Sequence, residues 1–413
     1  MNNNTYDVIV IGGGPAGMMA AITASQNGNT VLLIEKNTRL GEKLLITGGG
    51  RCNLTNNELD NRKLLLKYKE AKDYLFSPFS QFAVADTLQF FNTRGMETKI
   101  ENEGRVFPTT DKAETVWQIL QTEMQKQKVH ILTDTKVKKI VCVNTVIQHI
   151  ETTKGIYNAR HFILATGGLS HPETGSTGDG FNWLKDLGHT IKTPDASLVP
   201  LETKTAWVPT LQGVTLPTVK ITPIFQTQKG KSEKGKILFT HFGVTGPTIL
   251  NMSHTIGDKL NYGKVFLSID VLPHLDHGSL NTTLQKTLKE NDTKKIKNSL
   301  GNLFISSLVH IILTEASINE EKRCNSITRE ERMKIINTIK NLSIEIKGLM
   351  GKDKAIVTSG GISLDEVDFK TMRSKKIQNL SVVGDLLDIN RPSGGFSLQL
   401  CWTTGYVAGK SVR

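Results

Sequence analysis

The chain has little cysteine and no long apolar run, and both absences exclude classes of protein. Its four cysteines, Cys52, Cys142, Cys324 and Cys401, form no C-x-x-C pair, which argues against a zinc site or a disulfide framework. No run of about 18 apolar residues is free of polar interruption, so we expect no membrane span. Residues 8–24 are apolar but follow no basic leader, which favours a part of the fold over a signal peptide. A cytoplasmic enzyme fits these observations.

Residues 6–35 carry the clearest motif. An apolar segment predicts a buried strand, and Gly12, Gly14 and Gly17 follow it as G-x-G-x-x-G at the start of a small-residue helix. Such glycines let the backbone approach a pyrophosphate at the positive end of the helix. A second strand ends at Glu35, about where a carboxylate accepts hydrogen bonds from a ribose. The motif predicts an adenine dinucleotide, either NAD or FAD; the alternative is an α/β turn that binds nothing.

Residues 36–56 contain a second glycine cluster, Thr47-Gly-Gly-Gly-Arg-Cys-Asn53. The segment has too many glycines for a strand, and we expect a long loop. Three consecutive glycines expose backbone donors and allow close approach to a flat ring or a phosphate. A flexible loop is the alternative, but the Arg, Cys and Asn that follow the glycines favour a ligand-facing role.

Helices and strands then alternate along the chain. Helices are predicted over residues 61–95 and 111–127, and strands over 129–132, 136–143, 147–152 and 161–168. The last strand ends in the small-residue turn 165–168. In two-part dinucleotide domains such a turn lies beside the first glycine loop; the alternative is an ordinary strand end.

A compositional change near residues 194–200 indicates an insertion. Short β segments are predicted at 219–226, 236–239 and 264–270, residues 280–347 are predicted to be helical with a capping box at Thr328-Arg-Glu-Glu331, and strand character returns at 354–361 and 380–384. The predicted domains are residues 1–195 with 351–413, which form the α/β dinucleotide-binding domain, an inserted β-rich domain at 196–279 and an inserted helical domain at 280–350.

The C-terminal segment gives a reason to prefer one cofactor. Asp385 follows the final predicted strand, and Gly394 and Gly395 precede another small-residue helix. A carboxylate at such a position suits a polyol chain, because it accepts hydrogen bonds from hydroxyl groups. FAD has a ribityl chain that needs a contact of this kind, whereas a nicotinamide dinucleotide does not. The sequence therefore favours FAD.

Positive charge is in excess, with a formal net charge of +12. Residues 196–350 hold 20 Lys and Arg against 13 Asp and Glu, and residues 229–236 and 294–297 are the densest basic runs. The excess indicates either a polyanionic partner such as RNA or the lysine-rich composition that an AT-rich genome produces. A basic run is more often a solvated face than a binding site.

Several motifs together resemble one family along nearly the whole chain. They are DVIVIGGGPAG at 7–17, TGGGRCNLTN at 47–56, GRVFP at 104–108, TGSTGDG at 174–180, LFTHFGVTGP at 238–247, VTSGGISLDEVD at 357–368 and GDLLDINRPSGGFSLQ at 384–399. This set resembles the BaiN/YhiN-like family of FAD-dependent oxidoreductases, also described as aminoacetone oxidase-like flavoproteins. The resemblance implies an α/β fold: a two-dinucleotide-binding, Rossmann-like FAD domain with an inserted β-barrel-like domain and a small helical domain.

The motifs and the resemblance together predict the residues that hold FAD. These are Gly12, Gly14, Pro15, Ala16, Gly17, Glu35, Lys36, Lys43, Thr47, Gly48, Gly49, Gly50, Arg51, Cys52, Asn53, Val137, Ala165, Thr166, Gly167, Gly384, Asp385, Gly394, Gly395, Phe396 and Ser397. The chain departs from the family at Asp385, where Glu is usual, at Phe396-Ser397, where Tyr-Asn is usual, and at His171, where we expect an aromatic or apolar residue. Asp385 has a shorter reach than Glu, and Ser397 lacks an amide.

The resemblance implies hydride addition to an electron-poor C=C, in an unsaturated bile-acid ketone or in uridine of ribosomal RNA. Reduced FAD would supply the hydride, and a protein acid or water the proton. No second G-x-G-x-x-G with a following acid is visible, so we expect NAD(P)H to visit the flavin transiently. Cys52 and His241 are the candidate proton donors, and each also has a purely structural interpretation. A peroxide-producing amine oxidase and a non-catalytic RNA-binding flavoprotein are competing hypotheses.

Overall fold

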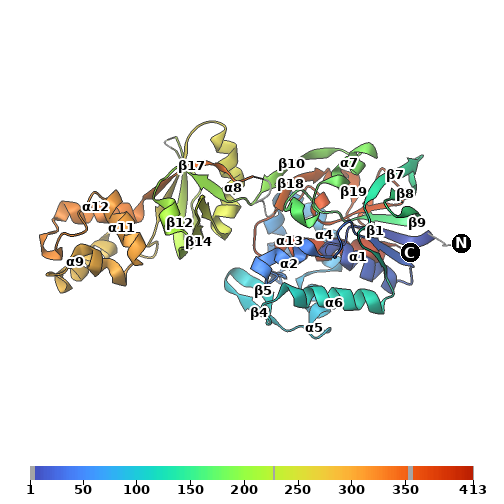
Figure 1. The fold of residues 1–413 in the computed structure, drawn as a ribbon, viewed down its shortest axis with the longest axis horizontal. Helices are drawn as coiled ribbons and strands as arrows, with labels where there is room; N and C mark the ends of the chain where they lie inside the picture. The colour runs from blue at the N-terminus through green and yellow to red at the C-terminus, as the bar shows by residue number, and fades with distance from the viewer. Residues whose placement is uncertain (1–4, 227, 352–356, 413) are drawn as a thin grey trace. The chain divides into compact units, whose positions relative to one another are not determined.

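The computed structural model describes residues 5–226, 228–351 and 357–412. The chain divides into two compact units (Figure 1). The first contains Met1–Ser197 and Lys352–Arg413, and the second contains Leu198–Gly351. The finer division of the insertion at residue 280 stays a prediction.

A nine-stranded sheet forms the centre of the first unit. Its parallel part consists, in spatial order, of β21 (Leu380–Val382), β9 (Gly155–Leu164), β1 (Thr5–Ile11), β2 (Val31–Ile34) and β6 (His130–Leu132). The apolar run Val8–Ile11 of β1 is buried, as expected for a central parallel strand covered on both faces. The pairing of β1 with both β2 and β9 confirms the predicted dinucleotide-binding arrangement.

Two helices from opposite ends of the chain, α1 (Pro15–Gln26) and α13 (Phe396–Ser411), pack tightly together (Figure 1). Glycines on α13 allow this contact. A Cβ added at Gly405 would lie 2.3 Å from the carbonyl oxygen of Ala16, and one added at Gly409 would lie 2.5 Å from that of Ala20. Each helix is preceded by a glycine, so both starts have a bare backbone.

The remaining helices and strands of the first unit include the outer strands of this sheet and two smaller sheets, one of three strands and one of two. They are α2 (Glu42–Gly50), β3 (Thr55–Asn56), α3 (Asn61–Leu65), α4 (Lys72–Gln81), α5 (Val84–Asn92), β4 (Thr98–Glu101), β5 (Arg105–Pro108), α6 (Ala113–Lys126), β7 (Val137–Val143), β8 (Val146–Thr152), α7 (Asp179–Asp186), β10 (Ile191–Ser197), β18 (Val357–Ile362), β19 (Val367–Asp368) and β20 (Arg373–Ser374). The chain leaves this unit through β10 and returns through β18, and these two strands pair antiparallel.

The second unit contains a closed barrel. Six strands follow one another around it: β12 (Thr215–Phe225), β14 (Glu233–Phe239), β15 (Gly243–Thr245), β11 (Leu201–Thr203), β17 (Leu342–Leu349) and β16 (Val265–Asp270). Pairing of β16 with β12 closes the ring, and the short β13 (Gln228–Lys229) extends β12 as a hairpin. Val219, Ile221 and Leu267 are buried at alternating strand positions, as expected for side chains that fill a small barrel.

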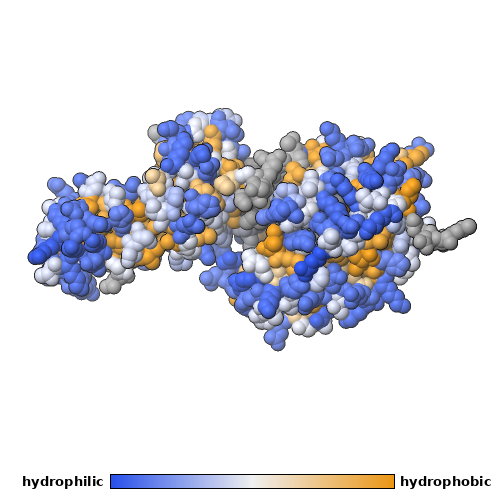
Figure 2. Space-filling model, in the orientation of Figure 1, coloured by the Kyte–Doolittle hydropathy of each residue, from blue (hydrophilic) through white to orange (hydrophobic). Residues whose placement is uncertain are grey.

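Helices complete the second unit and share its hydrophobic core with the barrel. They are α8 (Pro247–Leu260), α9 (His277–Glu290), α10 (Ile296–Ser299), α11 (Ser306–Glu315) and α12 (Arg329–Lys340). The predicted capping box is confirmed at the start of α12. Glu331 N donates to Thr328 Oγ1 (3.1 Å), and Thr328 N donates to Glu331 Oε2 (2.8 Å). Figure 2 shows hydrophilic residues gathered over the end of this unit where α9 and α12 lie.

Two sequence predictions of secondary structure need correction. The expected loop over residues 36–56 contains the short helical segment 42–46 of α2, whereas Thr47, Gly48, Gly49 and Gly50 leave the right-handed helical conformation. The expected helical run to Lys347 ends earlier, because β17 begins at Leu342. That strand is stabilised by pairing with β11 and β16, which are distant in sequence, so local pattern alone did not reveal it. The α/β fold class with an inserted barrel is confirmed.

None of the helices described in the structure is both long and apolar enough to cross a membrane.

Replacing Gly405 with Ala should force α13 away from α1. Overpacking of this kind costs about 1–3 kcal/mol, which corresponds to a fall in Tm of about 2–5 °C for a unit of this size. Thermal unfolding of the cofactor-free protein, followed by circular dichroism, measures the change. Gly348→Ala is the control, because no atom lies within 4 Å of the added Cβ. Equal Tm values for the two variants would contradict the packing argument.

Candidate functional site

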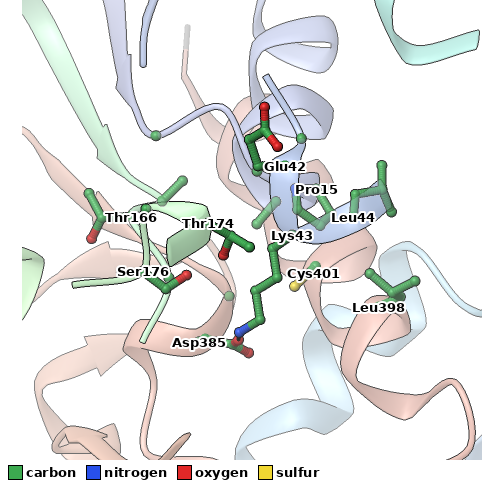
Figure 3. A pocket seen from close by; sticks show the side chains of 18 of the residues that line it. Pro15, Glu42, Lys43, Leu44, Thr166, Thr174, Ser176, Asp385, Leu398 and Cys401 are labelled. Atoms are coloured by element: carbon green, nitrogen blue, oxygen red, sulfur yellow. Dashed lines mark ion pairs between the residues drawn. The ribbon is translucent and has the colours of Figure 1, made fainter. Parts of the chain in front are cut away.

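A cavity in the first unit lies where strand ends and helix starts converge (Figure 3). Residues at the ends of β1, β9 and β21 line it together with the first residues of α1 and α13. Carboxyl ends of parallel strands are the usual ligand site of such sheets. A second, smaller cavity shares four of its lining residues, namely Gly12, Glu35, Thr166 and Gly175, so the two cavities lie next to one another.

The glycines of the first motif have different physical roles. Gly12 has a φ of 107°, and a Cβ there would lie 2.5 Å from the carbonyl oxygen of Ala165. A Cβ on Gly17 would lie 1.9 Å from the carbonyl oxygen of Gly12. Gly14, in contrast, has no neighbouring atom within 4 Å of an added Cβ and lines the cavity. Gly12 and Gly17 therefore permit packing, and Gly14 presents bare backbone at the start of α1.

Glu35 lies at the end of β2 and is 9% exposed. Its Oε2 accepts a hydrogen bond from Gly13 N (2.7 Å), and its Oε1 accepts one from Asn37 N (2.9 Å). Burial raises the pKa of this carboxyl group, although the backbone N–H groups partly oppose the shift. Each carboxylate oxygen has a second lone pair, so the side chain retains capacity for ribose hydroxyls.

The opposite end of the cavity is charged. Asp385 pairs with the buried guanidinium of Arg391, and Lys43 Nζ lies 3.5 Å from Asp385 Oδ2 (Figure 3). Arg391 Nε also donates to Ser397 Oγ (3.1 Å). Burial alone would raise the pKa of Asp385, but the charges of Arg391 and Lys43 outweigh it and hold this pKa below its usual value. The carboxylate therefore stays ionised and able to accept hydrogen bonds from hydroxyl groups.

One residue that lines the cavity carries a polar atom with no partner among the described residues. Thr166 Oγ1 is buried, and no group among the described residues forms a hydrogen bond with it. Buried hydroxyls are usually paired, and an unpaired one needs an explanation. A Cβ added at Gly180 of α7 would lie 2.2 Å from this oxygen, so the hydroxyl packs against α7 instead of facing the cavity. The bare backbone at Gly14 and the carboxylates of Glu35 and Asp385 fit FAD.

Many of the predicted FAD residues come together here. Those that line the larger cavity are Gly12, Gly14, Pro15, Ala16, Glu35, Lys43, Thr47, Ala165, Thr166, Gly167, Gly384, Asp385 and Ser397, and Lys36 and Val137 line the smaller one. Lys36 also forms an ion pair with Asp179 (2.8 Å). As contacts to FAD, all of these positions stay predictions.

Other predicted residues line neither described cavity: Gly17, Gly48, Gly49, Gly50, Arg51, Cys52, Asn53, Gly394, Gly395 and Phe396. Arg51 forms ion pairs with Glu101 and Asp111, and its guanidinium lies over the ring of Phe107. The Asn53 amide, oriented to satisfy both neighbours, donates to Thr55 O (3.1 Å) and accepts from Gly395 N (3.0 Å). Asn53 thus connects the two glycine segments, and Arg51 fixes the first of them to Glu101 and Asp111.

The two candidate proton donors differ in environment. Cys52 is fully buried, and burial raises the pKa of its thiol to about 12. His241 lies in the second unit, between β14 and β15, and is exposed. A catalytic role for either residue stays a prediction.

Some lining residues were not anticipated. They are Asn37, Gly41, Glu42, Leu44, Thr174, Gly175, Ser176, Val383, Leu398 and Cys401 in the larger cavity, and Ile11, Ile34, Thr135, Lys136, Asp179 and Trp183 in the smaller one. The TGSTGDG motif at 174–180 was a usable signal for Thr174–Ser176 and Asp179. Leu398 and Cys401 had none, because the sequence does not fix which face of α13 turns toward the cavity.

The fold and the site define a two-dinucleotide-binding α/β protein of the flavoprotein type, with a barrel inserted between its two parts. A family model described as HI0933-like protein Rossmann domain matches residues 6–411, and the chain belongs to this family of FAD-dependent oxidoreductases. The predicted family resemblance is confirmed.

Relatives are similar over their whole length. The chain is 29% identical to the 3-dehydro-bile acid delta(4,6)-reductase of Clostridium scindens and 27% identical to the ribosomal RNA dihydrouridine synthase of Haemophilus influenzae, with 98% of each chain covered in both comparisons. Among solved structures, the 3-ketosteroid-delta4-(5alpha)-dehydrogenase of Rhodococcus jostii RHA1 matches with a TM-score of 0.54 at 15% identity, over 99% of this chain and 96% of that one. The structural likeness supports the fold.

Replacing Thr166 with Val should leave both the stability and the FAD affinity of the protein intact. The free protein should be at least as stable, because the hydroxyl has no partner among the described residues, and FAD affinity should change by less than about twofold, because the hydroxyl packs against Gly180 and not in the cavity. Thermal unfolding and fluorescence titration with FAD measure the two effects. Thr404→Val is the control: Thr404 Oγ1 accepts from Gly384 N and donates to Leu400 O, so this change should lower Tm. A loss of FAD affinity of about fivefold or more in Thr166→Val would show that the hydroxyl contacts the cofactor and would contradict this interpretation.

Proposed function

We propose that this protein uses FAD and NAD(P)H to reduce the C5=C6 bond of uridine in ribosomal RNA. The observation that carries the proposal is full-length similarity to both an unsaturated bile-acid reductase and ribosomal RNA dihydrouridine synthases. The substrates named for these relatives share a C=C bond conjugated to a carbonyl group. Addition of hydride and proton to such a bond is therefore the chemistry common to the relatives.

Charge favours RNA over a small ketone as the substrate. The chain has a net charge of +12, and residues 196–350 alone hold 20 Lys and Arg against 13 Asp and Glu. Nucleic-acid affinity depends largely on cationic side chains that neutralise phosphates, whereas a steroid-like ketone requires no such excess. Reduction of a small unsaturated ketone is the second candidate, supported by the relative from Clostridium scindens.

The residues of the first unit would hold and orient the cofactor. Bound FAD supplies two-electron hydride chemistry. Gly14 would present backbone N–H groups to the pyrophosphate, Glu35 would accept hydrogen bonds from the ribose, and Asp385 from the ribityl hydroxyls. Because no second dinucleotide fingerprint is present, NAD(P)H would act as a transient reductant.

Loss of the gene should remove a specific dihydrouridine from ribosomal RNA. Mass spectrometry of rRNA fragments from cells with and without the protein tests this, since dihydrouridine is heavier than uridine by two hydrogen atoms. Re-expression of the intact protein should restore the modification. An unchanged rRNA mass map, together with NAD(P)H-dependent reduction of an unsaturated ketone, would favour the second candidate. Oxygen consumption with peroxide release from amines, without NAD(P)H, would indicate an amine oxidase.

Substitution of each of the two candidate proton donors should have a different effect on turnover. His241→Gln should lower turnover at least tenfold, the effect expected of a lost general acid. Cys52→Ser should change turnover by less than about threefold, because an enclosed thiol with a raised pKa is a poor acid. Rates of uridine reduction at saturating NAD(P)H, with FAD content measured for each variant, provide the test. Full activity in His241→Gln would contradict this role and indicate that water or another group donates the proton.

A further inference from the structure

A polar cavity of about 390 Å³ lies on the outside of the barrel in the second unit. Its lining includes Lys220 and Thr222 of β12, Ser268 and Asp270 of β16, and Lys229 of β13. His277 and Lys340, from α9 and α12, complete the opposite side. No function assigned above uses this cavity.

Strand register explains why polar groups gather on this wall. Lys220 pairs with Asp270 and Thr222 pairs with Ser268 across β12 and β16. The intervening residue of β12, Ile221, is fully buried in the barrel. Because side chains alternate along a strand, Lys220 and Thr222 share the outer face. The cavity floor is therefore a row of ammonium, hydroxyl and carboxylate groups.

The single carboxylate in the lining is already neutralised. Lys340 Nζ lies 2.6 Å from Asp270 Oδ2 and donates to the carbonyl oxygens of Leu272 (3.1 Å) and Leu275 (2.7 Å). These three contacts use all three protons of the ammonium group. Within the described parts of the chain, neither Lys220 nor Lys229 forms an ion pair. The cavity therefore carries two uncompensated positive charges.

Hydroxyl donors lie beside these charges. Thr222 Oγ1 and Ser232 Oγ are 2.8 Å apart and form a hydrogen bond with one another. Only one of the two protons is needed for that bond, so the pair can donate the other to a ligand. Two ammonium groups with a hydroxyl donor form a suitable environment for a phosphate group, which Lys binds as a point charge.

The two basic runs of the sequence differ in their ion pairs. In the run 294–297, Lys295 and Lys297 both pair with Glu321, and these contacts lower the pKa of Glu321 to about 2. In the run 229–236, the ion pair that the described residues show is Lys231 with Glu233 (3.4 Å). The run that borders the cavity is thus the one whose charge remains available.

We infer that this cavity binds a backbone phosphate of the RNA substrate, through Lys220, Lys229 and the Thr222–Ser232 hydroxyl pair. The inference rests on the proposed action on RNA and identifies the part of the second unit that would bind the RNA. A phosphate on a small molecule has the same chemistry, and the experiment below distinguishes the two sources.

The test compares the binding of a fluorescently labelled single-stranded ribosomal RNA fragment to the FAD-loaded protein and to the Lys220→Gln/Lys229→Gln variant over a range of salt concentrations. Each phosphate contact on a single strand contributes about 0.7 to the slope of log K against log salt. Loss of two contacts should flatten the slope by about 1.4 and weaken binding about 25-fold at about 0.1 M salt. Lys229→Gln alone should flatten it by about 0.7 and weaken binding about fivefold; Lys229 is exposed, so this variant should fold normally.

The matched control is Lys289→Gln/Lys334→Gln, which removes two charges from exposed positions on α9 and α12 that, like the cavity lysines, have no ion pair among the described residues. It should change RNA affinity by less than about threefold, because distant exposed charges are screened. An equal loss in both double variants would show a general charge effect and overturn the inference, as would unchanged RNA binding in the cavity variants. Calorimetric titration with inorganic phosphate completes the test. Phosphate binding that the cavity variants abolish, with RNA affinity intact, would assign the cavity to a small phosphate compound instead.

This binding experiment is independent of turnover. Reduction of free uridine or a small unsaturated ketone by the same preparations reports the proposed chemistry, and the cavity variants should leave that rate unchanged. RNA affinity that depends on Lys220 and Lys229 without uridine reduction would overturn the proposed reaction and keep the site. If uridine in RNA is reduced at a rate that neither lysine substitution changes, the phosphate site would be overturned and the proposed reaction kept.

Discussion

The first unit depends on a close contact between helices that are separated by almost the whole chain. Gly405 and Gly409 allow α13 to approach α1 until an added Cβ would fall within 2.5 Å of carbonyl oxygens. Because Pro15 at the start of α1 and Ser397 in the first turn of α13 both line the cavity, the same contact fixes the distance between two sides of the site. The cavity therefore forms only when both ends of the chain are folded together, and residues of the glycine motif at 12–17 line one side of it.

Sequence patterns predicted features that depend on neighbouring residues. The turn at Gly12, the acid at Glu35 and the capping box of α12 all follow from short spacings with a direct physical cause. The strand β17 was not predicted, because it is stabilised by pairing with strands that are far away in the sequence. Arg51 shows a similar limit for the site: its motif predicted a ligand contact, but its ion pairs with Glu101 and Asp111 depend on a separate hairpin.

Charge shows the same distinction between composition and arrangement. The number of lysines can be read from the sequence, but only the structure shows which of them are already neutralised by a carboxylate. Lys297 and Lys340 are paired within the second unit, whereas Lys220 and Lys229 have no such partner among the described residues. In the larger cavity of the first unit the carboxylate is the neutralised group, since Asp385 is matched by Arg391 and Lys43. A net charge thus becomes a hypothesis about binding only after the ion pairs have been assigned.

The insertion is connected to the first unit through two paired strands, β10 and β18. The chain leaves the first unit along one strand and returns along its antiparallel neighbour, so the two ends of the insertion lie next to one another. Insertions with adjacent ends are readily accommodated, because the parent domain needs no rearrangement to close the gap. Such a connection allows sequence changes to accumulate in one unit without disturbing the sheet of the other, so the two units can evolve separately.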